Sequence, residues 1–348
     1  MKKIVYVLVS LWLFYSIAIC AKNSNSIIFP PRLNPGDTVG LVAPGYRVSE
    51  NTQMQYAIER IQALGLKVKL GKSLYKRYGY FAGTDQDRAN DINQMFADKE
   101  VKAIITIRGG WGSNRILSLL NYKLIKNNPK IIIGYSDITS LLLAINAKTG
   151  MVTFHGPMAA LSWTKFTTKY VQDLLFKGDK ITFSNPIEDE DDLIHTKNRI
   201  ITIRKGKATG RLLGGSLTLL TSLLGSKYLP KFNGAILFVE EVDEDIYRID
   251  RMMTQLKTAG VLDKISGFVF GKCTNCGLGV NGSGPINSTY GSLTIQQVLE
   301  HHILPLHISA WYGSMIGHDN KIFTLPEGAM VTIDAENGTI QMLEAAVK

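Results

Sequence analysis

The chain has 348 residues, of which 45% are hydrophobic and 20% are charged, and its mean hydropathy is close to zero. This composition excludes a disordered chain, a collagen-like chain and a membrane protein with many spans, and the length predicts two domains of roughly 100–200 residues each. The formal net charge of +10 favours anionic partners such as nucleic acid, phospholipid or a cell-wall polymer. Three cysteines are too few for a fold built on disulfides.

The first 21 residues have the pattern of a secretory signal peptide. Two lysines precede an uncharged apolar run over residues 4–20, and Ala21 offers a small residue for cleavage. We therefore expect an exported, periplasmic protein that has lost residues 1–21, with the net charge lowered from +10 to +8. Two alternatives stay open. One is an uncleaved membrane anchor, and the other is lipid attachment at Cys20, whose preceding isoleucine fits that signal poorly.

Residues 33–163 alternate short apolar strands with helical patterns. Runs rich in valine and isoleucine at 39–43, 102–107 and 130–133 predict buried parallel strands. Apolar residues at helical spacing lie between these runs: Met54, Ile58, Ile61 and Leu64 in one helix, and Ala89, Ile92 and Phe96 in another. The alternation predicts an N-terminal α/β domain with a parallel, flavodoxin- or Rossmann-like sheet, and a site at the carboxyl ends of its strands.

The pattern weakens after residue 163, and we interpret residues 164–204 as an interdomain linker. Residues 205–345 then predict a C-terminal strand-rich α+β domain. Its expected strands cover residues 235–239, 268–270, 329–334 and 339–343, and its clearest helix has Ile246, Ile249, Met253 and Leu256 on one face.

Cys273 and Cys276 form a C-x-x-C pair in this second domain. In an exported protein the pair predicts either a disulfide or two unpaired thiols, and the sequence favours neither. A zinc site would need two further ligands at suitable spacing, and none lies nearby in the sequence.

A serine follows the third predicted strand. The strand ends at Gly134 and a helical pattern begins near Ile138, so Ser136 lies in a sharp turn like that of a nucleophile elbow, and the N–H of Asp137 could face a developing oxyanion. The alternative is that Ser136 or Asp137 only caps the helix. Another strand ends in Arg-Gly-Gly at 108–110, where the glycines would let a ligand approach backbone N–H groups or would simply form a turn.

A serine nucleophile also needs a base and an acid that orients it. Glu240 and Glu241 follow the strand predicted at 235–239 and are candidates for the acid. The pattern alone does not select the base among His155, His195, His301, His302, His307 and His318.

A series of short motifs, in order along residues 33–345, carries a family resemblance. They are 79–85 (Gly-Tyr-Phe-Ala-Gly-Thr-Asp) with Arg88, 108–112 (Arg-Gly-Gly-Trp-Gly), 134–139 (Gly-Tyr-Ser-Asp-Ile-Thr), 154–157 (Phe-His-Gly-Pro), 214–218 (Gly-Gly-Ser-Leu-Thr), 239–241 (Val-Glu-Glu), 247–251 (Tyr-Arg-Ile-Asp-Arg), and 317–318 (Gly-His) with 324–326 (Thr-Leu-Pro). In this combination the chain resembles the LD-carboxypeptidase family of serine peptidases, the muramoyl-tetrapeptide carboxypeptidases, which includes microcin C self-immunity peptidases.

The resemblance implies a catalytic triad of Ser136, Glu240 and His318, with an oxyanion hole formed by the N–H groups of Gly110 and Asp137. Because Ser136 and His318 fall in different predicted domains, it also implies an active site at the interface of the two domains. Further candidates for substrate binding are Arg108, Gly109 and His155. Arg108 is either a partner for the terminal carboxylate of the substrate or part of an ion pair within the fold, and His155 either shapes the pocket or packs behind the serine.

The implied function is release of the terminal D-Ala from peptidoglycan tetrapeptides, with no metal and no cofactor. We expect peptidoglycan peptides as partners, a homodimer, and attraction to the cell-wall or membrane surface in place of nucleic acid. One alternative is a related serine peptidase acting on a peptide–nucleotide antibiotic, for which Trp311 is a weak candidate to stack on a base. A second is a non-enzymatic cell-wall or solute-binding protein.

Overall fold

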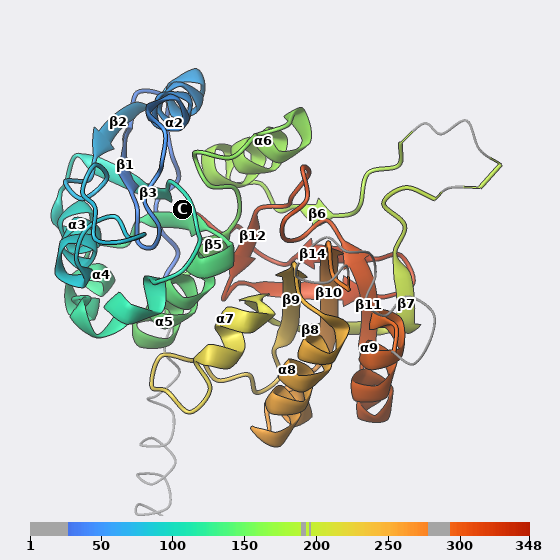
Figure 1. Ribbon diagram of the computed structural model, residues 1–348. Helices are drawn as coiled ribbons and strands as arrows, with labels where there is room; N and C mark the ends of the chain where they lie inside the picture. Colours follow the sequence, from blue (N-terminus) through green and yellow to red (C-terminus); the bar gives the residue numbers. More distant parts are fainter. Residues whose placement is uncertain (1–26, 189–192, 195, 278–292) are drawn as a thin grey trace, which may run out of the picture.

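The computed structural model describes residues 27–188, 193–194, 196–277 and 293–348. The predicted signal segment with Cys20 lies outside these residues, as does His195. The described residues form two sheets that lie side by side, one of six strands and one of eight (Figure 1). No helix in these ranges is both long enough and apolar enough to cross a bilayer.

The first sheet has the strand order β12-β5-β4-β3-β1-β2. Five of these strands are parallel, and β12 joins the edge of the sheet antiparallel to β5. The bounds are β1 (Thr38–Val42), β2 (Lys67–Leu70), β3 (Val101–Thr106), β4 (Ile131–Gly134), β5 (Thr153–His155) and β12 (Leu325–Glu327). The predicted parallel sheet is therefore confirmed, and its strands β1, β3 and β4 are the buried valine- and isoleucine-rich runs.

Helices connect the strands of this sheet. They are α2 (Asn51–Ala63), α3 (Asp85–Ala97), the 3-10 helix η1 (Ser113–Leu119), α4 (Tyr122–Asn127), the 3-10 turn η2 (Ser136–Ile138) and α5 (Thr139–Thr149). Helix α3 begins with a capping box, in which Thr84 and Asp87 satisfy each other's backbone N–H groups. Helix α5 is apolar on nearly every side because it is covered by the first sheet on one side and by β8 and α7 on the other.

The second sheet has the order β6-β14-β13-β8-β9-β10-β11-β7. Its four central strands, β8 to β11, are parallel, and the flanking strands are antiparallel to their neighbours. The bounds are β6 (Thr182–Phe183), β7 (Ile201–Arg204), β8 (Lys207–Ser216), β9 (Ile236–Val242), β10 (Gly267–Thr274), β11 (Ser309–Ser314), β13 (Met330–Asp334) and β14 (Thr339–Met342). Its helices are α7 (Leu217–Ser222), α8 (Ile246–Thr258), η4 (Leu262–Lys264), α9 (Ile295–Ile303) and η5 (Leu304–Leu306).

The segment between the two predicted domains is more ordered than its weak sequence pattern suggests. Residues 164–204 contain α6 (Lys165–Val171), a π-helical turn (Gln172–Lys177) and the two edge strands β6 and β7 of the second sheet. In the opposite direction, β12 comes from the C-terminal part of the chain and completes the first sheet. The segment 164–204 thus supplies both edge strands of the second sheet, and the C-terminal part supplies an edge strand of the first.

Cys273 and Cys276 are joined by a disulfide, with their Cα atoms 5.5 Å apart. The sequence left open a disulfide or two unpaired thiols, and the structure contains the disulfide. The bridge lies at the carboxyl end of β10, beside the end of β9.

Candidate active site

Ser136 lies in a tight turn at the carboxyl end of β4, immediately before α5. Its φ of 61° is in the left-handed region, which non-glycine residues rarely adopt and which recurs at functional sites. The residues in the N-cap positions of η2 and α5 are Tyr135 and Ile138, and neither makes a capping side-chain bond. Neither Ser136 nor Asp137 therefore occupies an N-cap position here, and the alternative that one of them only caps the helix is wrong.

Glu240 and His318 form a hydrogen-bonded pair beside this turn. The Nδ1 atom of His318 lies 2.9 Å from Oε2 of Glu240, whose side chain is completely buried at the carboxyl end of β9. Gly317, with φ of 102°, lies so close to Glu240 that a Cβ there would collide with the carboxylate. A glycine before the histidine is therefore needed for the pair to form.

The contact with Glu240 shifts the pKa of His318. Burial alone lowers the pKa of the imidazole, but the hydrogen bond to Glu240 and the negative charge of Glu240 outweigh it and leave the pKa above its ordinary value. The ring of Tyr135 lies edge-on to the imidazole with centroids 4.9 Å apart. Because Nδ1 is held by the carboxylate, Nε2 is the ring nitrogen that remains for other partners.

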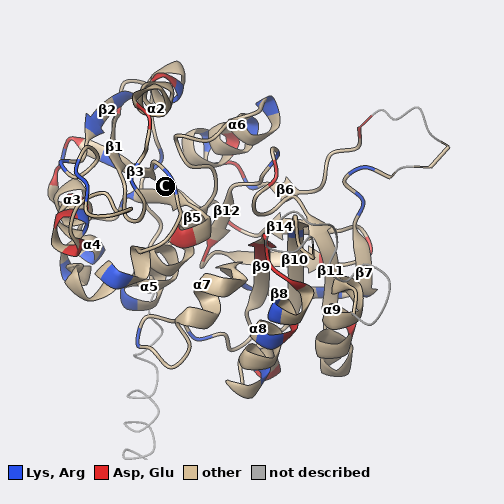
Figure 2. Ribbon diagram, in the orientation of Figure 1, with Lys and Arg blue, Asp and Glu red and all other residues tan. Residues whose placement is uncertain are grey.

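A second acidic residue, Glu241, follows at the end of β9, where acidic residues colour the strand tip red in Figure 2. Burial and then the charge of Glu240 raise the pKa of Glu241 to about 7, although its bonds to Thr218 oppose this. The strand end thus presents two carboxyl groups in different settings. Glu240 contacts the histidine, and Glu241 anchors the start of α7.

Asp137 holds the glycine loop against the serine turn. Its buried carboxylate accepts hydrogen bonds from the backbone N–H groups of Gly112, at 3.0 Å, and Ser113, at 3.0 Å. Burial raises the pKa of Asp137 to about 6, although these bonds lower it. The clamp keeps Gly109 and Gly110 beside Ser136, where a Cβ on Gly109 would lie 3.2 Å from the Cβ of Ser136.

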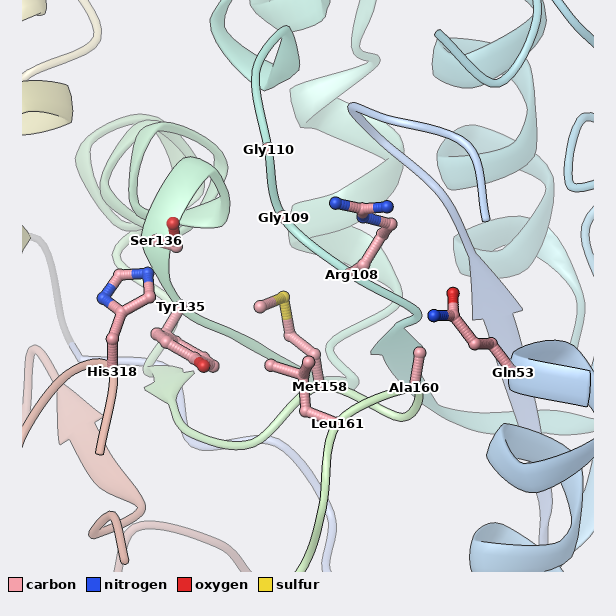
Figure 3. A pocket seen from close by; sticks show the side chains of 10 residues that line it. All are labelled: Gln53, Arg108, Gly109, Gly110, Tyr135, Ser136, Met158, Ala160, Leu161 and His318. Atoms are coloured by element: carbon pink, nitrogen blue, oxygen red, sulfur yellow. The ribbon is translucent and has the colours of Figure 1, made fainter. Parts of the chain in front are cut away.

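Ser136, His318 and the loop with Gly109 and Gly110 line a cavity of ≈ 260 Å³ (Figure 3). Its lining consists of Gln53, Arg108, Gly109, Gly110, Tyr135, Ser136, Met158, Ala160, Leu161 and His318. Figure 3 shows Ser136 and His318 on one side of the cavity and Arg108 on the other. The structure thus brings together Ser136, His318 and the Arg-Gly-Gly turn, with Glu240 and Asp137 directly behind them.

His155, a residue suggested for substrate binding, does not line the cavity. Its ring is fully buried and packs edge-on against Phe238, with centroids 5.2 Å apart. Neither ring nitrogen has a hydrogen-bond partner among the described residues, and burial lowers the pKa of His155 to about 4. His155 is therefore a neutral packing residue behind Tyr135.

Other predicted candidates lie away from the cavity. His302 bonds to Asp250 through Nε2, at 2.7 Å, on the face between α9 and α8. Trp311 is completely buried in β11 and donates to Ser314, so it cannot stack on a bound base. Within the described ranges, no group of three or more metal-ligating side chains is found.

Sequence reasoning missed the rest of the cavity wall. Tyr135 could have been inferred from its position next to Ser136, because it follows the same strand. Gln53, on α2, and the stretch 158–161 after β5 carry no chemical signal in the sequence, and only the fold brings them to this edge of the sheet.

We predict that Glu240→Gln lowers the pKa of His318. The change removes the charge that now offsets burial, so the pKa should fall by about 1–3. NMR titration of the imidazole measures it directly. Glu241→Gln serves as the control and should cause a smaller fall, since Glu241 acts on His318 by its charge without a hydrogen bond. An unchanged titration in Glu240→Gln would show that the pair does not form in solution.

Two family models match the chain. The model described as the LD-carboxypeptidase N-terminal domain matches residues 39–156, and that of the LD-carboxypeptidase C-terminal domain matches residues 209–333.

Whole proteins are similar over almost the full chain. A probable murein peptide carboxypeptidase of Bacillus subtilis (strain 168) is 38% identical over 322 residues, which cover 91% of this chain and 95% of that protein. The microcin C7 self-immunity protein MccF of Escherichia coli is 33% identical over 348 residues, with coverage of 92% and 97%.

Solved structures agree with these sequence matches. MccF without ligand superposes with a TM-score of 0.82 at 29% identity, covering 92% of this chain and 100% of that chain. A muramoyltetrapeptide carboxypeptidase from Oxalobacter formigenes superposes with a TM-score of 0.71 at 26% identity, covering 88% and 97%. The chain therefore belongs to the LD-carboxypeptidase family of serine peptidases and is a carboxypeptidase of that family.

Proposed function

We propose that this enzyme releases the terminal D-alanine from murein tetrapeptides, with Ser136, His318 and Glu240 as its catalytic triad. The observation that carries the proposal is the placement of the strained Ser136 turn and the His318–Glu240 pair around one cavity. The names of the relatives support the substrate class, since one is called a murein peptide carboxypeptidase and another a muramoyltetrapeptide carboxypeptidase.

The mechanism starts from the ring nitrogen that Glu240 leaves unbound, because Glu240 holds Nδ1 of His318. Nε2 of His318 takes the proton from the hydroxyl of Ser136 as its oxygen attacks the carbonyl carbon of the last peptide bond. The resulting imidazolium is stabilised by Glu240, consistent with the raised pKa of His318. His318 then gives the proton to the nitrogen of the leaving D-alanine, and it later removes a proton from the water that releases the tripeptide from Ser136.

Charge that develops on the carbonyl oxygen needs N–H donors. We assign these to the backbone N–H groups of Gly110, which lines the cavity with Ser136, and of Asp137, the residue that follows the serine. Arg108, on the far side of the cavity from His318, is the cationic side chain of this lining that we assign to a carboxylate of the substrate.

A second candidate function is hydrolysis of a peptide–nucleotide antibiotic. The specific observation in its favour is the similarity to MccF, which has been solved in complex with aspartyl sulfamoyl adenosine and with glutamyl sulfamoyl guanosine. The burial of Trp311 removes one group proposed for stacking on a base. Membership of a peptidase family leaves little support for a purely binding protein.

Murein tetrapeptide incubated with the purified protein should yield tripeptide and free D-alanine, detected by mass spectrometry and unaffected by EDTA. Ser136→Ala should reduce kcat by roughly 1,000-fold or more, because the nucleophile is lost. Ser118→Ala, an exposed serine on η1, is the matched control and should keep full activity. Cleavage of aminoacyl sulfamoyl adenosine with the tetrapeptide left intact would establish the second function instead.

Asp137→Asn should lower kcat by roughly 10–100-fold with a small change in KM, because the amide leaves one loop N–H without its acceptor and the oxyanion donors lose their position. Steady-state kinetics on the tetrapeptide measures both constants.

Asp91→Asn is the control for this variant. Asp91 is also buried and also accepts two consecutive backbone N–H groups, those of Lys72 and Ser73, but it does not line the cavity. Both variants should lose stability, and only Asp137→Asn should lose kcat. An equal loss of kcat in the two would show that Asp137 acts through general stability alone.

We also propose that the enzyme is exported and acts at the cell wall. The support is the basic and apolar N-terminal segment and the remaining net charge of +8 after its removal. Intact-mass analysis of the protein isolated from its own cells should give a chain that begins at Lys22. A mass that includes Met1, or a lipid on Cys20, would contradict cleavage after Ala21.

A further inference from the structure

A second cavity adjoins the one that contains Ser136, and Arg108 lines both. This second cavity has a volume of ≈ 340 Å³. Its lining consists of Tyr46, Arg47, Ser49, Arg77, Gly79, Tyr80 and Arg108. Figure 3 shows Arg108, the residue that the two cavities share, on the side of the first cavity opposite His318.

Three arginines face this space without an acidic partner. Among the described residues, no carboxylate lies within ion-pair distance of Arg47, Arg77 or Arg108. Arg88 and Arg115, which lie nearby in the same domain, share the carboxylate of Asp85. Three guanidinium groups that line one cavity repel one another, and an anion bound between them would remove that cost.

The walls of the cavity are ordered before any ligand arrives. The N–H of Arg47 donates to the carbonyl of Tyr80 at 3.1 Å, and the backbones of Tyr46 and Phe81 form an isolated antiparallel β-bridge. The rings of Tyr46 and Tyr80 are 5.0 Å apart, and the guanidinium of Arg108 lies 5.7 Å from the centroid of Tyr46. A binding site held in this way pays less ordering entropy when its ligand binds.

This cavity is also connected to the proposed oxyanion hole. Gly110 packs directly against the ring of Tyr46, leaving no space for a Cβ. An occupant of the cavity would therefore contact a side chain that touches the loop carrying the Gly110 N–H.

We propose that this cavity is a subsite for carboxylate groups in the part of the peptide substrate that the enzyme retains, upstream of the scissile bond. The inference rests on the proposed function. Arginine binds a carboxylate through two parallel hydrogen bonds, and the two tyrosines offer apolar faces and hydroxyl groups beside it. A stem peptide whose glutamate is linked through its side chain keeps a free α-carboxylate upstream of the scissile bond, which is the group that this chemistry would recognise.

The test uses two tetrapeptides that differ only in this carboxylate, which is free in one and amidated in the other. The wild-type enzyme should have a lower KM for the free acid, by roughly tenfold, as expected for hydrogen bonds to a charged group. Arg47→Gln and Arg77→Gln should each raise KM for the free acid and narrow the difference between the two peptides, with kcat less affected. Arg204→Gln, an exposed arginine on β7, is the control and should preserve the difference.

The possible results distinguish a failure of the proposed subsite from a failure of the proposed function. If neither peptide is hydrolysed, the proposed function fails. If both are hydrolysed but Arg47→Gln and Arg77→Gln leave the preference for the free acid unchanged, the subsite is wrong while the function stands. If inorganic phosphate or adenosine monophosphate competes with substrate in the wild type but not in the variants, and amidation has no effect, the cavity is a phosphate site and the carboxylate proposal is overturned.

Discussion

The hydrogen bond between Glu240 and His318 is the interaction on which the candidate site depends. A fully buried carboxylate is costly unless a donor or a cation faces it, and here that partner is the imidazole at 2.9 Å. The bond fixes the orientation of the ring and raises its pKa, and Gly317 allows the backbone to come close enough for it to form. An imidazole held in this way can act on Ser136 only if Ser136, which comes from the other sheet, is held at a constant distance from it.

Helix α5 provides that constraint. It begins directly after the Ser136 turn and is buried between the first sheet and the start of the second, where Thr139 accepts a hydrogen bond from the N–H of Ser216 at 3.0 Å. On the other side, the segment that carries His318 continues into β12, which pairs with β5 of the serine's own sheet. The segments that carry Ser136 and His318 are therefore connected twice, by packing through α5 and by strand pairing through β12.

Much of the fold could be predicted from local pattern, and the site only in part. The strands β1, β3 and β4 are recognisable in the sequence as apolar runs. Glycines at 210, 214 and 215 interrupt the apolar pattern of β8, and β5 has only three residues, too few to show the two-residue alternation of a strand. The turn at Ser136 follows from a strand ending in glycine before a helix. Choosing His318 among the histidines required family resemblance, since its partner Glu240 lies 78 residues away. The clamp from Asp137 to the glycine loop and the meeting of three arginines beside it depend on contacts between distant segments, which no local pattern records.

The pairing of β12 with the first sheet has a consequence for fragments of the chain. A fragment that ended after β5 would lack β12 and would expose the backbone of a buried strand as an open sheet edge, a ready template for pairing with another chain. The two halves recognised as separate family domains are thus not interchangeable modules. Recombination or truncation between them would separate Ser136 from Glu240 and His318, and it would also leave the serine-bearing half prone to aggregation.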